Sequence, residues 1–412
     1  MRDGARLLGL VPLVAAVAGA APAAAADRSI VGFERGVDAG RFAQIVERAG
    51  GRVTKRLDGI RAAAVRPRGG RSAKALRAAL RKRGGVRYAE PDFTLRKSAT
   101  PDDPLLFRQY ALGTGGGAIS APPAWDARTS CSKVAVLDSG VQHSHPDLEA
   151  NVWHNSGEIN DNGNDDDRNG YVDDYYGVNV RKGSGSGGDA DGHGTHVAGI
   201  VGGRGNNDVG VSGLCWSAKI MPVRFMDDHG RGSTSDAIAG LDYAVDQGAK
   251  IVNCSFGSSS KSTALHDAID DAQDHGVLLV VAAGNDGDSL ESHPEYPASY
   301  KDGNIVTVAA TTSTDALADF SNFGSTAVDL AAPGDGIYST YPTSSYRYLD
   351  GTSMASPYVA GAAAMLRSAD PGLSYSQIRS ALLGSVDKLT GLQGKTATGG
   401  RLNLDRALER VG

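Results

Sequence analysis

Short apolar runs alternate with helical stretches along residues 101–412. Runs of this kind are typical of strands that a parallel sheet buries on both faces. We expect strands at residues 134–137, 220–223, 251–253, 277–282 and 305–309. Helical stretches such as residues 235–247 and 263–275 lie between them. This alternation predicts an α/β domain with a doubly wound parallel sheet and helices on both faces.

A second, shorter pattern occupies residues 27–100. It predicts strand, helix, strand, strand, helix and strand, in that order. The strands are expected at residues 30–31, 53, 60–65 and 86–88, and the helices at residues 42–49 and 73–81. Such an order is typical of a small α+β, ferredoxin-like domain.

The first 26 residues have the three parts of a secretory signal peptide. Arg2 and Arg6 precede an apolar run over residues 7–18, and alanines at 23–26 provide a small-residue cleavage site. The alternative is a membrane anchor, but the run is well short of the ~20 residues that a span needs. We therefore expect a secreted, extracellular protein with no membrane partner.

Charge is unevenly divided along the chain. The 412 residues carry 42 Lys and Arg against 47 Asp and Glu, a net charge of −5. Residues 27–100 hold 19 basic and 7 acidic residues, a net +12, whereas residues 101–412 hold 21 and 39, a net −18. The Arg-rich segment alone would suit a nucleic acid. The signal peptide argues against nucleic acid as the partner. We expect the basic segment to bind the acidic remainder of the same chain instead.

The three cysteines are Cys131, Cys215 and Cys254. Export permits disulfides, and an odd count leaves one thiol over. Cys254 ends an apolar run that predicts a buried strand, so we expect it to be free and Cys131 to pair with Cys215. The absence of a C-x-x-C motif argues against a cysteine zinc site.

Three residues carry candidate chemistry, and each also has a plainer interpretation. Asp138 follows a predicted strand, at the edge where open α/β sheets place their sites, but such a residue is also a helix cap or a Mg²⁺ ligand. His193 and His196 open a predicted helix without the Glu and the spacing of an H-E-x-x-H zinc site. Ser353 precedes a small-residue helix, where serine is often only an N-cap.

The order Asp138, His193, Ser353 is that of the subtilisin triad, and not that of chymotrypsin or the α/β-hydrolases. Residues 101–412 resemble a secreted serine peptidase of the subtilisin family, the subtilases, around all three positions. The segment Ala-Ala-Gly-Asn at 282–285 matches the family's oxyanion asparagine, here Asn285. Residues 29–95 resemble the family's inhibitory propeptide, most clearly at residues 86–91.

The resemblance implies a role for each matched residue. Ser353 would attack the scissile carbonyl, His193 would carry the proton, and Asp138 would orient the imidazole. The amide of Asn285 would donate to the oxyanion together with the backbone N–H of Ser353. We expect Thr352 to support this oxyanion site and His196 to be packed in the helix.

Two segments are matched by resemblance to the strands that hold the substrate backbone. They are Gly230-Arg231-Gly232 and Ser255-Phe256-Gly257. Asp286 and Glu295 match positions near the rim and base of the pocket for the P1 side chain, the substrate residue before the scissile bond. Two carboxylates there would favour Lys or Arg at P1, and two solvated loop acids with broad specificity are the alternative.

An acidic loop at residues 162–174 predicts a structural Ca²⁺ site. Oxygen ligands recur at alternate positions around a glycine, as in the first part of an EF-hand loop, without the Glu at its twelfth position. The expected ligands are Asp165, Asp167, Asn169, the carbonyl of Tyr171, and Asp173 or Asp174. A solvated acidic loop is the alternative interpretation.

A second Ca²⁺ site is implied by the resemblance alone. Its ligands would be the side chains of Asp103, Asp147 and Asn207 and the carbonyls of Gly205, Val209 and Val211. Ions at such sites hold loops in place and stabilise the folded state.

The sequence therefore predicts a signal peptide at 1–26, an inhibitory propeptide at 27–100 and a peptidase domain at 101–412. The leading hypothesis is a secreted, monomeric, calcium-stabilised serine endopeptidase that processes itself from a zymogen. Its partners would be protein or peptide substrates and its own propeptide, with no nucleic acid. The rivals are a narrow processing protease for basic P1 sites and a catalytically idle, calcium-dependent binding protein.

Overall fold

The computed structural model describes residues 24–93, 99–185 and 187–411. The chain divides into two compact units, residues 1–97 and 98–412. Most of the predicted signal peptide, residues 1–23, lies outside the described residues. Among the described residues, no helix combines the length and the apolarity that a membrane crossing requires.

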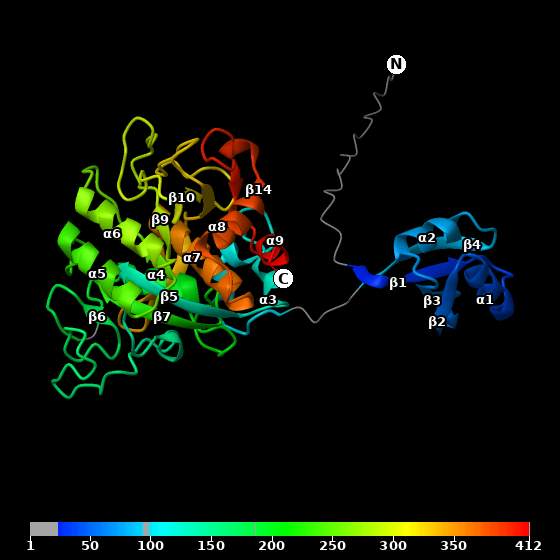
Figure 1. The fold of residues 1–412 in the computed structure, drawn as a ribbon, viewed down its shortest axis with the longest axis horizontal. Helices are drawn as coiled ribbons and strands as arrows, with labels where there is room; N and C mark the ends of the chain where they lie inside the picture. Colours follow the sequence, from blue (N-terminus) through cyan, green and yellow to red (C-terminus); the bar gives the residue numbers. More distant parts are fainter. Residues whose placement is uncertain (1–23, 94–98, 186, 412) are drawn as a thin grey trace, which may run out of the picture. The chain divides into compact units, whose positions relative to one another are not determined.

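The smaller unit is a four-stranded antiparallel sheet with two helices (Figure 1). Its elements are β1 (Ala24–Phe33), α1 (Ala39–Arg48), β2 (Gly51–Leu57), β3 (Ala62–Pro67), α2 (Ala73–Arg81) and β4 (Val86–Phe93). The strand order β2-β3-β1-β4 is that of a ferredoxin-like sandwich. Apolar residues from both helices and from the sheet form its own core, among them Phe33, Phe42 and Leu76.

Two boundaries of the smaller unit differ from those that the sequence suggested. The predicted strand at residues 60–65 begins only at Ala62, because residues 58–60 form a 3₁₀ turn and Arg61 has a left-handed backbone with φ +51°. At the other end, β1 begins at Ala24, which pairs with Phe93. The strand therefore reaches three residues into the predicted signal peptide.

The larger unit is built on a nine-stranded sheet in the order β14-β15-β11-β10-β9-β8-β5-β7-β6. All neighbouring strands are parallel except the short edge pair β14 and β15. The strands are β5 (Ser130–Asp138), β6 (Val178–Asn179), β7 (Ser217–Arg224), β8 (Ile251–Cys254), β9 (Leu278–Ala282), β10 (Ile305–Thr311), β11 (Leu330–Pro333), β14 (Asp387–Lys388) and β15 (Gly400–Arg401). The helices are α3 (Ala121–Trp125), α4 (His193–Gly202), α5 (Thr234–Asp246), α6 (Thr263–Asp274), α7 (Thr352–Ala369), α8 (Tyr375–Gly384) and α9 (Leu404–Glu409).

Helices cover both faces of this sheet, as the alternating pattern predicted. Successive side chains of a strand point to opposite faces. On β5, Val134 and Val136 belong to the core beneath α4 and α7, whereas Ala135 and Leu137 belong to the core beneath α5 and α6. Because both faces of β5 are buried, residues 134–137 of this strand form a continuous apolar run in the sequence.

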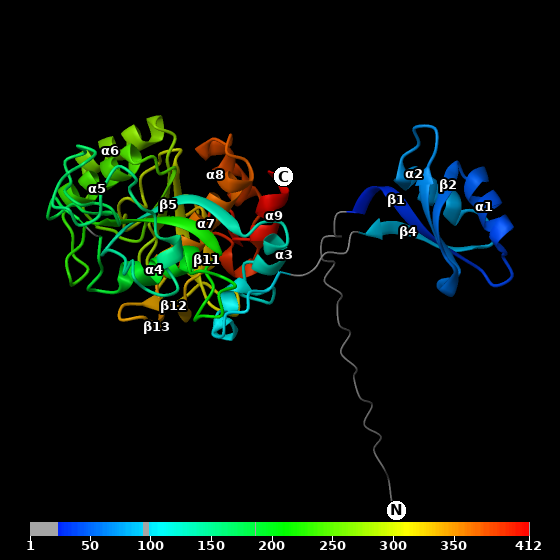
Figure 2. The ribbon, with the colours of Figure 1, turned by 90° about the horizontal axis from the view of Figure 1, so that it is seen from below.

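A hairpin stands apart from the main sheet and packs on α4. It is formed by β12 (Ile337–Tyr341) and β13 (Ser345–Leu349), which pair antiparallel. Figure 2 shows the hairpin beside α4, on the side of the larger unit away from α5 and α6. The hairpin therefore braces the helix whose first residue is His193.

The disulfide prediction is confirmed. Cys131 is bonded to Cys215, across 84 residues of sequence, and Cys254 is a free and buried thiol in β8.

Candidate active site

The structure brings Asp138 and His193 into direct contact. Asp138 is the last residue of β5 and is fully buried, and His193 is the first residue of α4, with 27% of its side chain exposed. Nδ1 of His193 lies 2.8 Å from Oδ1 of Asp138, which also accepts a hydrogen bond of 2.7 Å from the N–H of Ser139. Burial is the largest single effect and opposes protonation of the imidazole, but the carboxylate of Asp138, with smaller contributions from Asp191 and Asp189, raises the pKa of His193 overall.

Ser353 is the second residue of α7, a helix whose small side chains allow it to be buried almost all round. Its hydroxyl donates to the backbone carbonyl of Ser255 over 3.2 Å, and the Ser255 hydroxyl donates back to the Ser353 carbonyl over 3.0 Å. These two bonds attach the start of α7 to the segment that follows β8.

Asn285 and Thr352 form a second contact at the start of α7. Oδ1 of Asn285 accepts hydrogen bonds from the N–H and the hydroxyl of Thr352, both 2.9 Å long. Thr352 is fully buried, and its hydroxyl oxygen also accepts the N–H of Gly284 over 3.1 Å. The carbonyl end of the Asn285 amide is therefore held, and its NH₂ group remains available as a donor.

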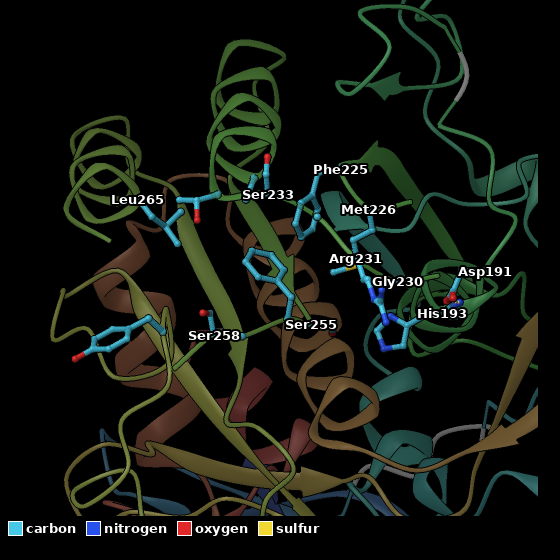
Figure 3. A pocket seen from close by; sticks show the side chains of 16 residues that line it. Asp191, His193, Phe225, Met226, Gly230, Arg231, Ser233, Ser255, Ser258 and Leu265 are labelled. Carbon is cyan, nitrogen blue, oxygen red and sulfur yellow. Dashed lines mark hydrogen bonds between the residues drawn. The ribbon is translucent and has the colours of Figure 1, made fainter. Parts of the chain in front are cut away.

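A cavity of about 430 Å³ opens beside His193 (Figure 3). Both predicted substrate segments line it, Gly230 to Gly232 from one side and Ser255 to Gly257 from the other. Phe225 and Phe256 pack against each other with ring centroids 4.7 Å apart, and they form part of its apolar wall. The cavity thus joins an apolar recess to the two backbone segments next to the histidine.

The structure also brings together Asp286 and Glu295, whose carboxyl groups are hydrogen-bonded to each other. Burial and then this contact raise the pKa of Glu295 to about 7. Glu295 lies between two glycines: a Cβ added to Gly257 or to Gly284 would come within 2.8 or 2.6 Å of its Oε2. Gly257 also lines the cavity, so the carboxyl pair lies behind the cavity wall.

The acidic loop gathers around a residue that the spacing did not reveal. Ligand oxygens of Glu158, Asp165 and Asp167 lie within 4.8 Å of one another. Glu158 is buried, and its Oε2 has no hydrogen-bond partner, although its Oε1 accepts the N–H groups of Asp166 and Asp167. An orphaned buried carboxylate oxygen beside two further carboxylates is what a cation site requires.

The other predicted ligands of this loop separate into two groups. Asp174 is fully buried, and Asn169 donates to it and to Asp167. Asp173 instead faces the opposite end of the loop, where its carboxylate accepts the N–H groups of Asn162 and Gly163. Asp174 therefore fits the cluster and Asp173 does not. Tyr171 follows Asn169 on the same loop and donates its N–H to it.

The second predicted cation site is also assembled. Asp147 is fully buried, and its two oxygens accept bonds from the amide of Asn207 and the N–H of Val211. Burial raises the pKa of Asp147 to about 6. Asp103 is almost as buried and accepts the N–H of Asn207 over 3.5 Å. The two remaining predicted residues, Gly205 and Val209, lie in the same loop as Asn207 and Val211.

Comparisons with known proteins agree with this architecture. Residues 130–405 match the subtilase family, and residues 15–92 match the fervidolysin N-terminal prodomain. Thermitase of Thermoactinomyces vulgaris is 39% identical over 312 residues, which are 75% of this chain and 99% of thermitase. An extracellular protease of Xanthomonas campestris is 36% identical over 349 residues, 78% of this chain and 59% of that protein. A solved protease of Pseudoalteromonas arctica superposes with a TM-score of 0.66 at 30% identity, covering 76% of this chain and all of that one.

Fold, cleft and relatives together define a serine-type endopeptidase. More particularly, the chain belongs to the subtilase family, and it carries a propeptide ahead of its peptidase unit.

Proposed function

We propose that the protein is a secreted serine endopeptidase that matures by cleaving itself, with Asp138, His193 and Ser353 as its catalytic triad. The observation that carries this proposal is the 2.8 Å contact between Asp138 and His193 at the mouth of the cavity. Ser353 is tied to the same cavity through Ser255. A secreted location is in line with the signal-peptide pattern at the N-terminus and with the extracellular protease of Xanthomonas campestris.

The proposed reaction is acyl transfer in two halves. Oγ of Ser353 attacks the peptide carbonyl while Nε2 of His193 takes its proton, and the same proton then passes to the leaving amine. Asp138 accepts the Nδ1–H bond and so fixes the tautomer that leaves Nε2 free to act as base. Water then attacks the acyl-enzyme with His193 again as base, which releases the acid and restores Ser353.

Substrate binding must first redirect the Ser353 hydroxyl. In the structure it donates to the Ser255 carbonyl, whereas attack requires that it donate to His193. Catalytic hydrogen bonds commonly form only in the substrate complex. The oxyanion would then receive the NH₂ group of Asn285 and the N–H of Ser353.

Recognition of the substrate backbone is assigned to the two cavity segments. An extended peptide between Gly230–Gly232 and Ser255–Gly257 would add a strand to each of them, with main-chain hydrogen bonds providing affinity. Because these bonds do not depend on side chains, they suit an endopeptidase that acts on many sequences.

A preference for Lys or Arg at P1 is assigned to the Asp286–Glu295 pair. Support comes from the positions of the two residues. Asp286 directly follows Asn285, and Glu295 lies behind Gly257 of the cavity wall. Burial and the neighbouring Asp286 favour the protonated form of Glu295 in the free protein, and a cationic P1 side chain would favour its ionised form. The preference is proposed for an otherwise general endopeptidase.

Calcium is assigned to both acidic clusters. Glu158, Asp165, Asp167, Asn169 and Asp174 would hold one ion, and Asp103, Asp147 and Asn207 with backbone carbonyls of residues 205–211 would hold the other. These hard oxygen donors suit Ca²⁺. A bound ion would neutralise carboxylates that otherwise repel one another, and so hold the loops in place.

Self-processing tests the proposal directly. N-terminal sequencing of secreted wild-type protein should give a chain that begins between about residues 96 and 103, whereas Ser353→Ala should retain the propeptide. The matched control Ser368→Ala changes a serine near the far end of the same helix, α7, and it should still mature. A Ser353→Ala protein that loses its propeptide in pure form would contradict self-cleavage. The idle binding protein predicts no processing in any variant.

A further inference from the structure

The carboxylate of Asp189 is the centre of a dense hydrogen-bond network next to the active site. Its Oδ1 accepts the Ser139 hydroxyl over 3.0 Å and the N–H groups of Asp191 and Gly192 over 3.1 and 2.8 Å. Its Oδ2 accepts the N–H and the hydroxyl of Thr195 over 2.9 and 2.6 Å. One side chain thus receives five hydrogen bonds, all from neutral donors.

These donors lie directly after β5, directly before α4 and in the first turn of α4. Ser139 directly follows Asp138 at the end of β5, and Thr195 lies in the first turn of α4, which begins at His193. The Ser139 hydroxyl also accepts the N–H of Gly194 over 2.9 Å. Asp189 therefore joins the end of the strand to the start of the helix through side chains that are fully buried.

The β12–β13 hairpin also forms hydrogen bonds with the start of α4 and with the segment before it. The Thr340 hydroxyl donates to the carbonyl of Thr195, and the Tyr341 hydroxyl donates to the carbonyl of Asp191. These hairpin bonds reach only the start of α4 and the segment before it, whereas the bonds of Asp189 and Ser139 connect that start directly to the end of β5.

Resting on the catalytic role proposed for His193, we propose that Asp189 is a positioning residue that sets the distance between Asp138 and His193. Its charge has a second effect. After the opposing effect of burial and the favourable effect of Asp138, the carboxylates of Asp191 and Asp189 also favour the protonated imidazole. Removing Asp189 should therefore alter both the geometry and the titration of His193.

Asp189→Asn is the direct test, because it keeps the size of the side chain but turns an NH₂ group toward N–H donors. The concentration of active mature protein is determined by titrating Ser353 with a fluorophosphonate. Values of kcat and KM are then measured over a pH series with one peptide substrate. We expect kcat to fall roughly 100-fold, because a small misplacement of a catalytic group costs about that much. KM should change little. The acidic limb of kcat/KM should move to lower pH, since a negative charge near His193 is lost.

Glu291→Gln is the matched control. Glu291 accepts four hydrogen bonds in another loop, from the Ser289 hydroxyl, the N–H and hydroxyl of Thr326 and the N–H of Ala327. This variant should lose stability without a shift of the acidic limb. A role for Asp189 in folding alone predicts that both variants behave in this way.

Two further measurements decide the remaining cases. Ser139→Ala removes the link to β5 but keeps the charge of Asp189 and its bonds to Thr195. It should therefore lower kcat through the geometry, with a smaller shift of the acidic limb that comes only from a weaker Asp138–His193 contact. This variant provides the test if Asp189→Asn does not fold. The proton NMR signal of the His193 Nδ1–H group, which needs no turnover, should shift or broaden in either variant. Folded variants with wild-type kcat, limb and Nδ1–H signal would overturn the proposal. A wild-type protein that neither hydrolyses peptides nor reacts at Ser353 would instead overturn the proposed function.

Discussion

Thr352 determines which end of the Asn285 amide faces the reaction. Both of its hydrogen-bonding groups hold Oδ1 of Asn285, and its backbone begins the helix that carries Ser353. A single buried threonine thus orients the proposed oxyanion donor and fixes it to the helix of the proposed nucleophile. Preorganised donors of this kind act on the transition state without a reorganisation cost.

Asn285→Ala should therefore lower kcat by about 100- to 1,000-fold, the range for loss of one oxyanion donor. KM should change little, because the donor acts mainly on the transition state. Thr352→Val keeps the Asn285 amide but removes one of its two anchors, and it should cost less. Steady-state kinetics on titrated enzyme measures both, and an equal loss in kcat and in 1/KM would argue against the assignment.

Glu295 gives a pH-dependent prediction for specificity. The pKa of Glu295 is raised to about 7, so the side chain is protonated below that pH and gains a negative charge above it. The ratio of kcat/KM for a P1 Lys substrate to that for a matched P1 Gln substrate should rise roughly tenfold or more between pH 5.5 and 8.5. The ratio cancels the titration of His193, which affects both substrates alike.

Glu295→Gln should flatten this dependence, and Glu409→Gln, an exposed acid on α9, should leave it unchanged. A wild-type ratio that stays constant with pH, or that favours an apolar P1 side chain throughout, would remove the carboxyl pair from specificity.

At the level of elements, the β12–β13 hairpin links the acidic residues of the second proposed cation site to α4. At one end, Nε2 of His145 lies 3.1 Å from the Ser345 carbonyl, and Tyr346 contacts Asp147. Elsewhere on the hairpin, the Ser339 hydroxyl donates to the carbonyl of His196 in α4. Contacts therefore run from the loop of the proposed cation site through the hairpin to α4, which begins at His193.

Chelation should lower the melting temperature of the mature protein. An ion present at a hundredfold excess over its Kd stabilises the folded state by about 2.7 kcal/mol per site. Glu158→Gln should reduce the effect of chelator, because Glu158 supplies the orphaned oxygen of the first cluster, whereas Glu149→Gln, an exposed acid nearby in sequence, should not. Differential scanning calorimetry measures this, and an unchanged melting temperature in excess chelator would exclude calcium.

The elements themselves could be predicted from the sequence because burial on both faces leaves a simple apolar pattern, as on β5. Ser353 and His193 could be predicted only as members of an ordered set, since each alone is a common helix start. Glu158 could not, because its place in the cluster depends on how the loop folds back and not on EF-hand spacing. Asp189 lies four residues before His193, but its five donors come together only in the folded chain.

For the whole molecule, the charge division is the main feature that a net charge of −5 conceals. The smaller unit has its own apolar core and carries a net +12 over residues 27–100, against −18 for residues 101–412. Opposite charges steer association more than they tighten a complex. The mature enzyme should have a pI well below the value of 6.0 for the whole chain.

Inhibition of the mature enzyme by added propeptide should therefore begin more slowly as salt rises, because the long-range attraction is screened. The dissociation rate should change much less, which provides an internal control. Stopped-flow inhibition kinetics across a salt series measures both rates. An association rate that is independent of salt would show that the charge difference does not guide docking.

The nucleophilic role of Ser353, activated by His193, can be measured by stoichiometric labelling with a fluorophosphonate. Mass spectrometry of folded, mature protein should find one adduct per molecule, on Ser353, and His193→Ala should slow its formation by orders of magnitude. Folded protein that remains unlabelled, or that carries its label on another residue, would contradict this role.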